Sequence, residues 1–302
     1  MVLAHTIHRP LSEINYLAGN RVVVLCVVSL QLMSTVQSQP VGNLLREWRQ
    51  RWRMSQLDLA CEAEISSKHV SFLETGRSLP SREMLLHLAE RLEIPLRERN
   101  ILLVAAGYAP VFPERSLEDP ALQAARKAVD LVLAGHEPYP ALAIDRHWNL
   151  IASNNAVPSL LGGVDPALLR PPVNVLRVSL HPAGLASRIA NLPEWRAHLL
   201  ARLRHQIDLT ADPVLVELMR ELSGYPMPSG ARSSKPTADR DYAGVVVPFQ
   251  FITEGGLLTF FSTTTIFGTP IDIALSELAL ESFYPADAVT AAAVRRFAQG
   301  RT

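Results

Sequence analysis

Side chains suited to DNA contacts are concentrated in one short stretch, residues 49–77. A lysine there, Lys68, can donate hydrogen bonds to O6 and N7 of guanine or to a phosphate, and neighbouring serine hydroxyls pair with several bases. Phe72 can touch thymine methyl groups. Glutamine and arginine at the ends of helices are suited to phosphates, which fix the register of a protein on DNA. The predicted DNA contacts are Gln56, Ser66, Ser67, Lys68, Ser71 and Arg77.

Five short helices are predicted to position these side chains within residues 41–107. Apolar residues recur there at helical spacing, with polar turns between the runs and no alternation typical of a strand. Ser55 and Asp58 form a capping box that opens the second helix, and Leu57 and Ala60 are expected to face inward. This stretch is therefore predicted to be a compact all-α unit.

The third helix carries the predicted base contacts. Ser66 can cap its first turn, Val70 and Leu73 share the face toward the core, and Gly76 follows where a helix end favours glycine. The same pattern also suits an ordinary helical bundle whose cations form a solvated face, and a lysine such as Lys68 can be exposed without reading a base. The first and fourth helices are marked by Leu45, Trp48, Leu85, Leu88, Ala89 and Leu92.

Three segments resemble the Cro/repressor-type (XRE) helix-turn-helix: Ser55–Ala60, Ser66–Val70 and Leu73–Pro80. The resemblance covers residues 41–98 and implies that the third helix enters the major groove of operator DNA. It also implies an internal ion pair between Arg49 and Glu74. The family usually has glycine between the second and third helices, where this chain has Glu64. We expect that turn to avoid a left-handed conformation or to carry strain.

A proline-containing linker, residues 108–118, is predicted to join the helical domain to a second domain, residues 119–297. The second domain is predicted to be α+β, with Ser223–Asp241 as a mobile loop. Its predicted helices are Pro120–Gly135, a short one from Asn154, Glu194–Gln206 and Pro213–Leu222. Its predicted strands are Ala141–Asp145, Trp148–Ala152, Val245–Thr253, Leu257–Ile266 and an alternating run through Ile271, Ile273 and Leu275, before Phe283–Pro285 closes the sheet.

Residues 140–155 resemble the opening of a PAS-type sensor fold, in which a hairpin runs into a helix through asparagine. Three further segments are similar to the C-terminal domain of MmyB-like regulators: Asn191–Arg196, Phe267–Asp272 and Glu281–Asp287. Together with the helix-turn-helix, the resemblance spans nearly everything after residue 40. It implies a multidomain chain, with an all-α five-helix DNA-binding domain followed by a PAS-like domain that holds a lipid-like or fatty-acid ligand.

An apolar cavity for an acyl chain is predicted on the sheet. Its predicted lining is Leu142, Ile144, Phe249, Phe251, Phe260 and Phe261. A filled core is an equally good interpretation, because aromatic and aliphatic residues at strand spacing ordinarily pack against each other. An acyl carboxylate requires a cation or a hydroxyl, for which Arg188, Arg196 and Arg204 are candidates by residue type alone.

Composition restricts the class of protein. The 302 residues are 48% apolar, enough for two buried cores, and Lys+Arg and Asp+Glu balance at 29 each, so DNA affinity requires a local patch. Cys26 and Cys61 lack metal-ligand spacing, which predicts reduced thiols in the cytoplasm. The apolar run Val22–Leu30 is too short to span a bilayer. We interpret residues 1–40 as a disordered or mis-assigned extension, with translation beginning at Met33.

Motifs for catalysis, metal binding and phosphate binding are missing from the sequence. It contains no Gly-x-Ser-x-Gly elbow, no Cys-x-x-Cys pair and no glycine-rich phosphate loop, so no catalytic site, metal or cofactor is predicted. The predicted function is a homodimeric one-component transcription regulator that binds a double-stranded DNA operator under the control of an apolar, possibly fatty-acid, ligand. Two alternatives stay open, a DNA-silent adaptor that binds other proteins and an enzyme with an activity in the second domain.

Overall fold

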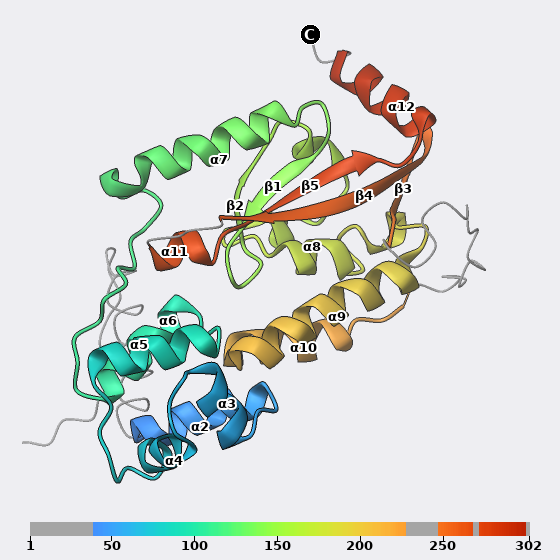
Figure 1. The fold of residues 1–302 in the computed structure, drawn as a ribbon. Coiled ribbons are helices and arrows are strands. Elements are labelled where there is room, and N and C mark those ends of the chain that lie inside the picture. Colours follow the sequence, from blue (N-terminus) through green and yellow to red (C-terminus); the bar gives the residue numbers. More distant parts are fainter. Residues whose placement is uncertain (1–38, 228–246, 268–271, 300–302) are drawn as a thin grey trace, which may run out of the picture.

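A helical part and a part built around a β-sheet lie side by side in the structure (Figure 1). The extension 1–38, most of the predicted loop Ser223–Asp241 and the centre of the motif Phe267–Asp272 lie outside the described residues. No helix among the described residues is both long enough and apolar enough to cross a bilayer. The computed structural model describes residues 39–227, 247–267 and 272–299.

Helices α2 to α6 form the helical part and begin where the sequence predicts helix starts. Ser55 accepts a hydrogen bond from the backbone N–H of Asp58, whose carboxylate accepts one from the N–H of Ser55, so the capping box is present. Ser66 and Ser81 cap α4 and α5 with their hydroxyl oxygens. The bounds are α2 (Val41–Arg51), α3 (Gln56–Glu62), α4 (Ser67–Glu74), α5 (Arg82–Arg91) and α6 (Leu96–Ala105).

The prediction that Leu57 faces the core of the helical part is wrong. Leu57 is 61% exposed, whereas Leu59 and Ala60 are buried at 1% and 2%. The reason is the 100° rotation per residue of an α-helix, which puts Leu57 on the outer face when Leu59 and Ala60 face the core. The remaining predicted core positions are buried: Leu45, Trp48, Val70, Leu73, Leu85, Leu88, Ala89 and Leu92.

A residue in the left-handed conformation follows each of these helices. Gly76 (φ 71°) and Gly107 (φ 85°) follow α4 and α6, where glycine adopts this conformation without a steric cost. Arg53 (φ 54°), Glu64 (φ 53°) and Glu93 (φ 48°) follow α2, α3 and α5. A side chain in this conformation costs roughly 1–2 kcal/mol. The turn at Glu64 is therefore left-handed and strained.

The sheet-containing part begins after a segment without helix or strand between Ala105 and Pro120. The helices predicted from Pro120, around residues 194–206 and from Pro213 are all present. The bounds are η1 (Pro120–Leu122), α7 (Gln123–Gly135), β1 (Ala141–Ile144), β2 (Leu150–Ser153), η2 (Val157–Leu160), η3 (Pro166–Leu169), α8 (Val175–Leu180), η4 (Ala186–Arg188), α9 (Leu192–Thr210), α10 (Pro213–Ser223), β3 (Phe249–Thr253), β4 (Gly256–Ile266), α11 (Ile273–Ser276), β5 (Ala279–Pro285) and α12 (Ala288–Gln299).

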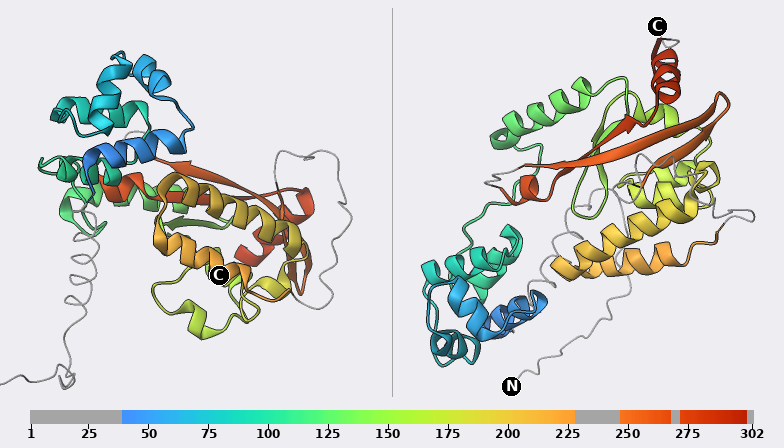
Figure 2. Two further views of the ribbon diagram at one scale, coloured as in Figure 1. Left: turned by 90° about the horizontal axis from the view of Figure 1, so that it is seen from below. Right: turned by 45° about the vertical axis from the view of Figure 1, so that its right-hand side comes forward.

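The described strands form one antiparallel sheet in the order β2-β1-β5-β4-β3. Helix α7 covers one face, where Val129 and Leu133 pack against Ala143 of the central strands. Helices α8, α9 and α10 cover the other face, where Leu203 and Phe251 belong to the largest apolar cluster (Figures 1 and 2). The arrangement confirms the predicted α+β class.

The run before β5 differs from its prediction. Ile273 and Leu275 lie in the short helix α11 and not in a strand, and Ile271 lies outside the described residues. The carboxylate of Asp272 accepts a hydrogen bond from the N–H of Ala274 and caps this turn, which makes helix more favourable than strand despite the alternating pattern. Strand β5, which contains the predicted Phe283–Pro285, lies in the middle of the sheet.

The hairpin between β1 and β2 also has a longer turn than predicted. The sequence predicts Trp148 in the second strand, but it lies in the turn with φ 65°, and β2 begins at Leu150. The short helix predicted from Asn154 begins at Val157. Asn154 is buried and donates from its amide to the backbone oxygen of Tyr139, so it fixes the loop ahead of that helix.

Candidate functional site

The outer face of α4 carries most of the side chains predicted to contact DNA. Figure 1 shows this helix on the side of the helical part that is remote from the sheet. Val70 and Leu73, at 2% and 1% exposure, fix the orientation of α4 on the core. Among the predicted contacts, this orientation leaves Ser66, Ser67 and Lys68 exposed and Ser71 half-buried.

Two cations of this surface lie against one aromatic ring. The Nζ atom of Lys68 is 5.5 Å from the centroid of the Phe72 ring, and the Cζ atom of Arg77 is 5.8 Å from it. Arg77 is exposed, directly after the left-handed Gly76. Cation–π contacts of this kind contribute about 0.5–1 kcal/mol at exposed sites. Phe72 thus positions two positive charges close together at the surface of α4.

The carboxylate of Glu74 is the centre of a buried polar cluster. Arg49 donates from Nε to Oε1 at 2.6 Å and from Nη2 to Oε2 at 2.9 Å, which is the ion pair expected from the family resemblance. Arg46 donates to Oε2 from 3.3 Å. Burial raises the pKa of Glu74, but the hydrogen bonds from Arg49, Gln56 and Arg46 and the charge of Arg49 together outweigh burial and hold the pKa below its usual value. The cluster joins α2, α3 and the end of α4.

Gln56 faces this cluster as well as the surface. Its Nε2 atom donates to Oε2 of Glu74 at 2.9 Å, and the residue is half-buried. An amide nitrogen carries two hydrogens, so one stays available for a phosphate while the other binds Glu74. This contact places Gln56 beside the C-terminal end of α4.

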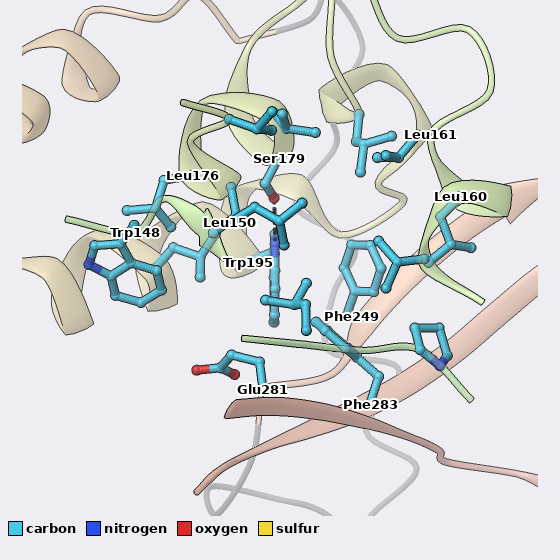
Figure 3. Close-up of a pocket in the computed structure, with 18 of the residues that line it drawn as sticks. Trp148, Leu150, Leu160, Leu161, Leu176, Ser179, Trp195, Phe249, Glu281 and Phe283 are labelled. Carbon is cyan, nitrogen blue, oxygen red and sulfur yellow. Dashed lines mark hydrogen bonds between the residues drawn. The ribbon is translucent and has the colours of Figure 1, made fainter. Parts of the chain in front are cut away.

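An apolar cavity of ≈ 120 Å³ lies between the sheet and helices α8 and α9 (Figure 3). The indole rings of Trp148 and Trp195 and the ring of Phe249 point into it. The rings of Trp195 and Phe249 have centroids 5.0 Å apart, so they form one continuous aromatic wall. Aliphatic side chains complete the lining, among them Leu142, Leu150, Leu160, Leu161, Leu176 and Leu199.

The structure divides the six residues predicted to line a cavity. Leu142 and Phe249 line the ≈ 120 Å³ cavity, while the fully buried Phe251 and Phe260 lie in the wall of a second, larger cavity of ≈ 1020 Å³. Ile144 is 3% exposed and packs within the core.

The prediction that Phe261 lines the cavity is wrong. Its ring stacks on Tyr284 with centroids 5.3 Å apart, and it lines neither of the two cavities. Neighbouring residues of a strand point to opposite faces, so Phe260 and Phe261 do not share a face of β4.

Three aromatic residues of the cavity, Trp148, Trp195 and Phe283, are missing from the predicted lining. Each lies in a segment that carries a family resemblance: residues 140–155, 191–196 and 281–287. The family resemblance of those segments is the sequence signal that could have identified these three residues. The residues come together only when the hairpin turn, α9 and β5 meet in the fold.

Few polar groups reach the cavity. The hydroxyl of Ser179 accepts a hydrogen bond from Nε1 of Trp195 at 3.1 Å. Arg202 and Glu281 form an ion pair in the wall, and Thr264 donates to Oε1 of Glu281 at 2.8 Å. Because Glu281 already balances its charge, Arg202 is not an uncompensated cation for an acidic ligand.

The three arginines proposed by residue type have different surroundings. Arg188 lines the second cavity and donates to the backbone oxygens of Leu160 and Gly162. Arg196 donates to the backbone oxygens of Leu222 and Ser223 at the end of α10. Arg204 is exposed and lines neither cavity. Among these three, Arg188 alone lines one of the two cavities described above.

Comparison with known proteins matches both parts of the chain. Residues 40–102 match a helix-turn-helix domain family. Residues 125–297 match the family described as MmyB-like transcription regulator ligand binding domain. A protein of Methanoculleus marisnigri, named as an HTH-type transcriptional regulatory protein, is 35% identical over 116 residues. That alignment covers 37% of this chain and 37% of the relative, so the chain spans little more than a third of the length of this relative.

These matches agree with the geometry. The helix-turn-helix match contains α4 with its exposed Lys68, and the second match contains the helices and strands around the ≈ 120 Å³ cavity. The second match alone covers more than half of the chain. The chain therefore belongs to the MmyB-like transcription regulators, with a helix-turn-helix domain preceding the ligand-binding domain.

Proposed function

We propose that this regulator binds operator DNA by inserting α4 into the major groove, with Ser67, Lys68 and Ser71 facing bases and Gln56 and Arg77 on phosphates. The observation that supports this is the orientation of α4. Its apolar side is buried while Ser66, Ser67 and Lys68 are exposed, on the side of the molecule remote from the sheet.

The proposed regulator is a homodimer. Helix-turn-helix dimers bind two half-sites about one helical turn, ~34 Å, apart, and two heads are needed to read such a site. A monomer in solution that stays a monomer on a selected duplex, as measured by light scattering, contradicts this part of the proposal.

The proposed ligand is an apolar small molecule, with a long-chain fatty acid as the candidate. The ≈ 120 Å³ cavity has a wall made almost entirely of aliphatic and aromatic side chains. Its size is close to that of an engineered apolar cavity of about 150 Å³ that binds benzene. Pro140 and Leu160 line both cavities, so the two lie next to each other. A chain longer than the first cavity holds would have to extend past these two residues, with its polar end beside Arg188 of the second cavity.

DNA selection from a random duplex pool tests the first part of the proposal. The full chain should enrich one sequence class and bind it with an affinity that falls steeply with salt, because the arginine and lysine contacts release counterions. An adaptor that acts on proteins alone should enrich no sequence and show no salt-dependent retention of DNA.

Solvent extraction of the purified chain, followed by mass spectrometry, tests the ligand. We expect a recovered acyl compound, or a rise in melting temperature when dodecanoic acid is added, since a ligand that binds only the folded state stabilises it. Leu199→Trp, which fills the cavity, should abolish the rise. If no compound is recovered and dodecanoic acid produces no thermal shift in the original chain, the ligand proposal is contradicted.

A further inference from the structure

The turn between β1 and β2 is shared by the cavity and by the contact between the two parts of the molecule. The indole of Trp148 lines the cavity. Two residues earlier, Arg146 lies near carboxylates outside the cavity, with Nη1 at 3.7 Å from Oε1 of Glu277 and Nη2 at 3.6 Å from Oδ2 of Asp212. A displacement of Trp148 therefore acts on a turn that also carries Arg146.

Glu277 is held at the same time by the DNA-binding part. Arg97 of α6 donates from Nε to Oε1 of Glu277 at 2.8 Å and from Nη2 to Oε2 at 3.0 Å. The same guanidinium binds both carboxylate oxygens of Glu114. Glu277 thus connects Arg146 of the sheet-containing part to Arg97 of the helical part. A separate ion pair lies nearby in the sequence, between Asp272 and Arg115.

Helix α9 provides a second connection between the turn that joins β1 to β2 and the DNA-binding helices. Gln206 accepts a hydrogen bond from Nε1 of Trp148 at 2.8 Å and donates to the backbone oxygen of Arg146 at 2.7 Å. One turn further along α9, the backbone oxygen of Leu209 accepts a hydrogen bond from Arg51 of α2 at 3.4 Å. Figures 1 and 2 show the end of α9 beside the DNA-binding helices.

We propose that the turn 145–149 and its Arg146–Glu277–Arg97 contacts couple occupancy of the cavity to the orientation of the DNA-binding helices. A ligand that moves Trp148 shifts Arg146 relative to Glu277 and thereby changes the position at which α6 is held. Such coupling exists only if the ligand has different affinities for the two arrangements. The inference rests on the proposed function, of which it specifies the regulation.

The test compares the original chain with Arg146→Gln, using dodecanoic acid as the probe and a duplex selected by the original chain. In the original chain, saturating acid should change the dissociation constant for DNA by at least about fivefold. In Arg146→Gln the change should fall below about twofold, while the affinity for DNA alone and for the acid alone stays the same. Arg146 touches neither the cavity nor the predicted DNA surface.

Two further variants make the result specific. Arg146→Lys should keep most of the coupling, because contacts of 3.6–3.7 Å to carboxylates are charge attractions that an ammonium group can also make. Arg126→Gln on α7, which breaks an exposed ion pair with Glu118, serves as the matched control and should leave the coupling intact.

Hydrogen exchange of the backbone amides gives a readout that needs no DNA. Dodecanoic acid should change the exchange of α6 in the original chain and not in Arg146→Gln. Two outcomes overturn this inference and leave the proposed function intact. One is an Arg146→Gln variant in which the acid still changes the affinity for DNA as much as in the original chain. The other is an acid that binds but changes neither the affinity for DNA nor the hydrogen exchange of α6. An original chain that retains no duplex and no acid overturns the proposed function itself and this inference with it.

Discussion

Phe72 shows how one side chain organises a charged surface. Its ring lies against both Lys68 and Arg77, which belong to different turns of the chain, one within α4 and one beyond it. A cation held over a ring loses less conformational freedom on binding than a freely rotating one. We expect the two cations to act on DNA in different ways nevertheless, because only Lys68 lies within the helix proposed to enter the groove.

Replacement of each cation by alanine separates base reading from phosphate binding. Lys68→Ala should relax the choice of operator sequence by about 1–3 kcal/mol at one position. Arg77→Ala should weaken all duplexes alike and lower the slope of log affinity against log salt by about 1. Binding to a set of single-base operator variants, measured at several salt concentrations, checks this. Lys127→Ala on exposed α7 is the control, and equal sequence-independent losses would assign both residues to phosphates.

Glu74 is the residue on which the stability of the helical part depends most directly. The residue is 3% exposed, and its carboxylate accepts hydrogen bonds from Arg49, Gln56 and Arg46. Removal of one partner of a buried ion pair leaves the other charge buried without compensation.

Glu74→Gln should therefore reduce the free energy of unfolding by about 3–5 kcal/mol near neutral pH. Because the pKa of Glu74 is lowered in the folded state, its contribution is present above the ordinary pKa of a glutamate and is lost as the pH falls through the lowered value. The difference between the two proteins should shrink in acid. Thermal unfolding at several pH values measures it, with the exposed Glu62→Gln as control. A difference that persists unchanged in acid contradicts the ion-pair account.

At the scale of elements, the ends of the helices decide the geometry of the DNA-binding part. Each of α2 to α6 is followed by a left-handed residue, and only two of the five are glycine. The turn at Glu64 sets the angle between α3 and α4, so the strain there lies at the point where the proposed recognition helix is oriented. A residue with a side chain also restricts the unfolded chain more than glycine does.

Glu64→Gly should raise the free energy of unfolding by roughly 1 kcal/mol, because relief of left-handed strain exceeds the entropy cost of glycine. Glu62→Gly, inside the last turn of α3, should instead destabilise by about the same amount. Chemical denaturation of both variants is the measurement. Destabilisation by Glu64→Gly would show that this turn depends on the side chain.

At the scale of the whole molecule, the contact between the two parts contains a network of charged side chains. Arg97 and Arg51 of the helical part face Arg146, Asp212 and Glu277 of the sheet-containing part. Polar contacts of this kind allow relative motion of domains more readily than large apolar ones. This is the property that a coupling between ligand and DNA requires.

Glu98 provides a probe of this contact. Burial raises the pKa of the Glu98 carboxyl, with a further contribution from Asp212, although the charges of Arg146 and Arg97 oppose the rise. A raised pKa means that the charged form is unfavourable in the folded state, so the cost appears as the pH rises through that pKa.

Glu98→Gln, which resembles the protonated acid, should accordingly raise the melting temperature by about 2 °C near neutral pH and have no effect below about pH 4. Differential scanning calorimetry across this range checks the prediction. The control is Glu90→Gln on the outer side of α5. If the rise in melting temperature caused by Glu98→Gln is largest in acid, the pH dependence is opposite to the one expected and contradicts a raised pKa of Glu98.

Local chemistry in the sequence was sufficient for the helical part. Serine caps, glycine after α4 and apolar residues at helical spacing act within a few positions of each other, so Ser55, Ser66 and Gly76 marked elements that the structure contains. The one wrong core residue there, Leu57, lay at a helix start, where the phase of the helix depends on a single position. The fold class of the second part also followed from its alternating patterns and its family resemblance.

The tertiary structure alone decided the cavity and the contact between the two parts. Trp148, Trp195 and Phe283 are far apart in sequence and meet because a turn, a helix and a central strand pack together. Whether aromatic side chains fill a core or leave a space depends on the distance between those elements, which periodicity does not encode. For the same reason the link from Arg97 to Glu277, 180 positions apart, left no pattern in the sequence.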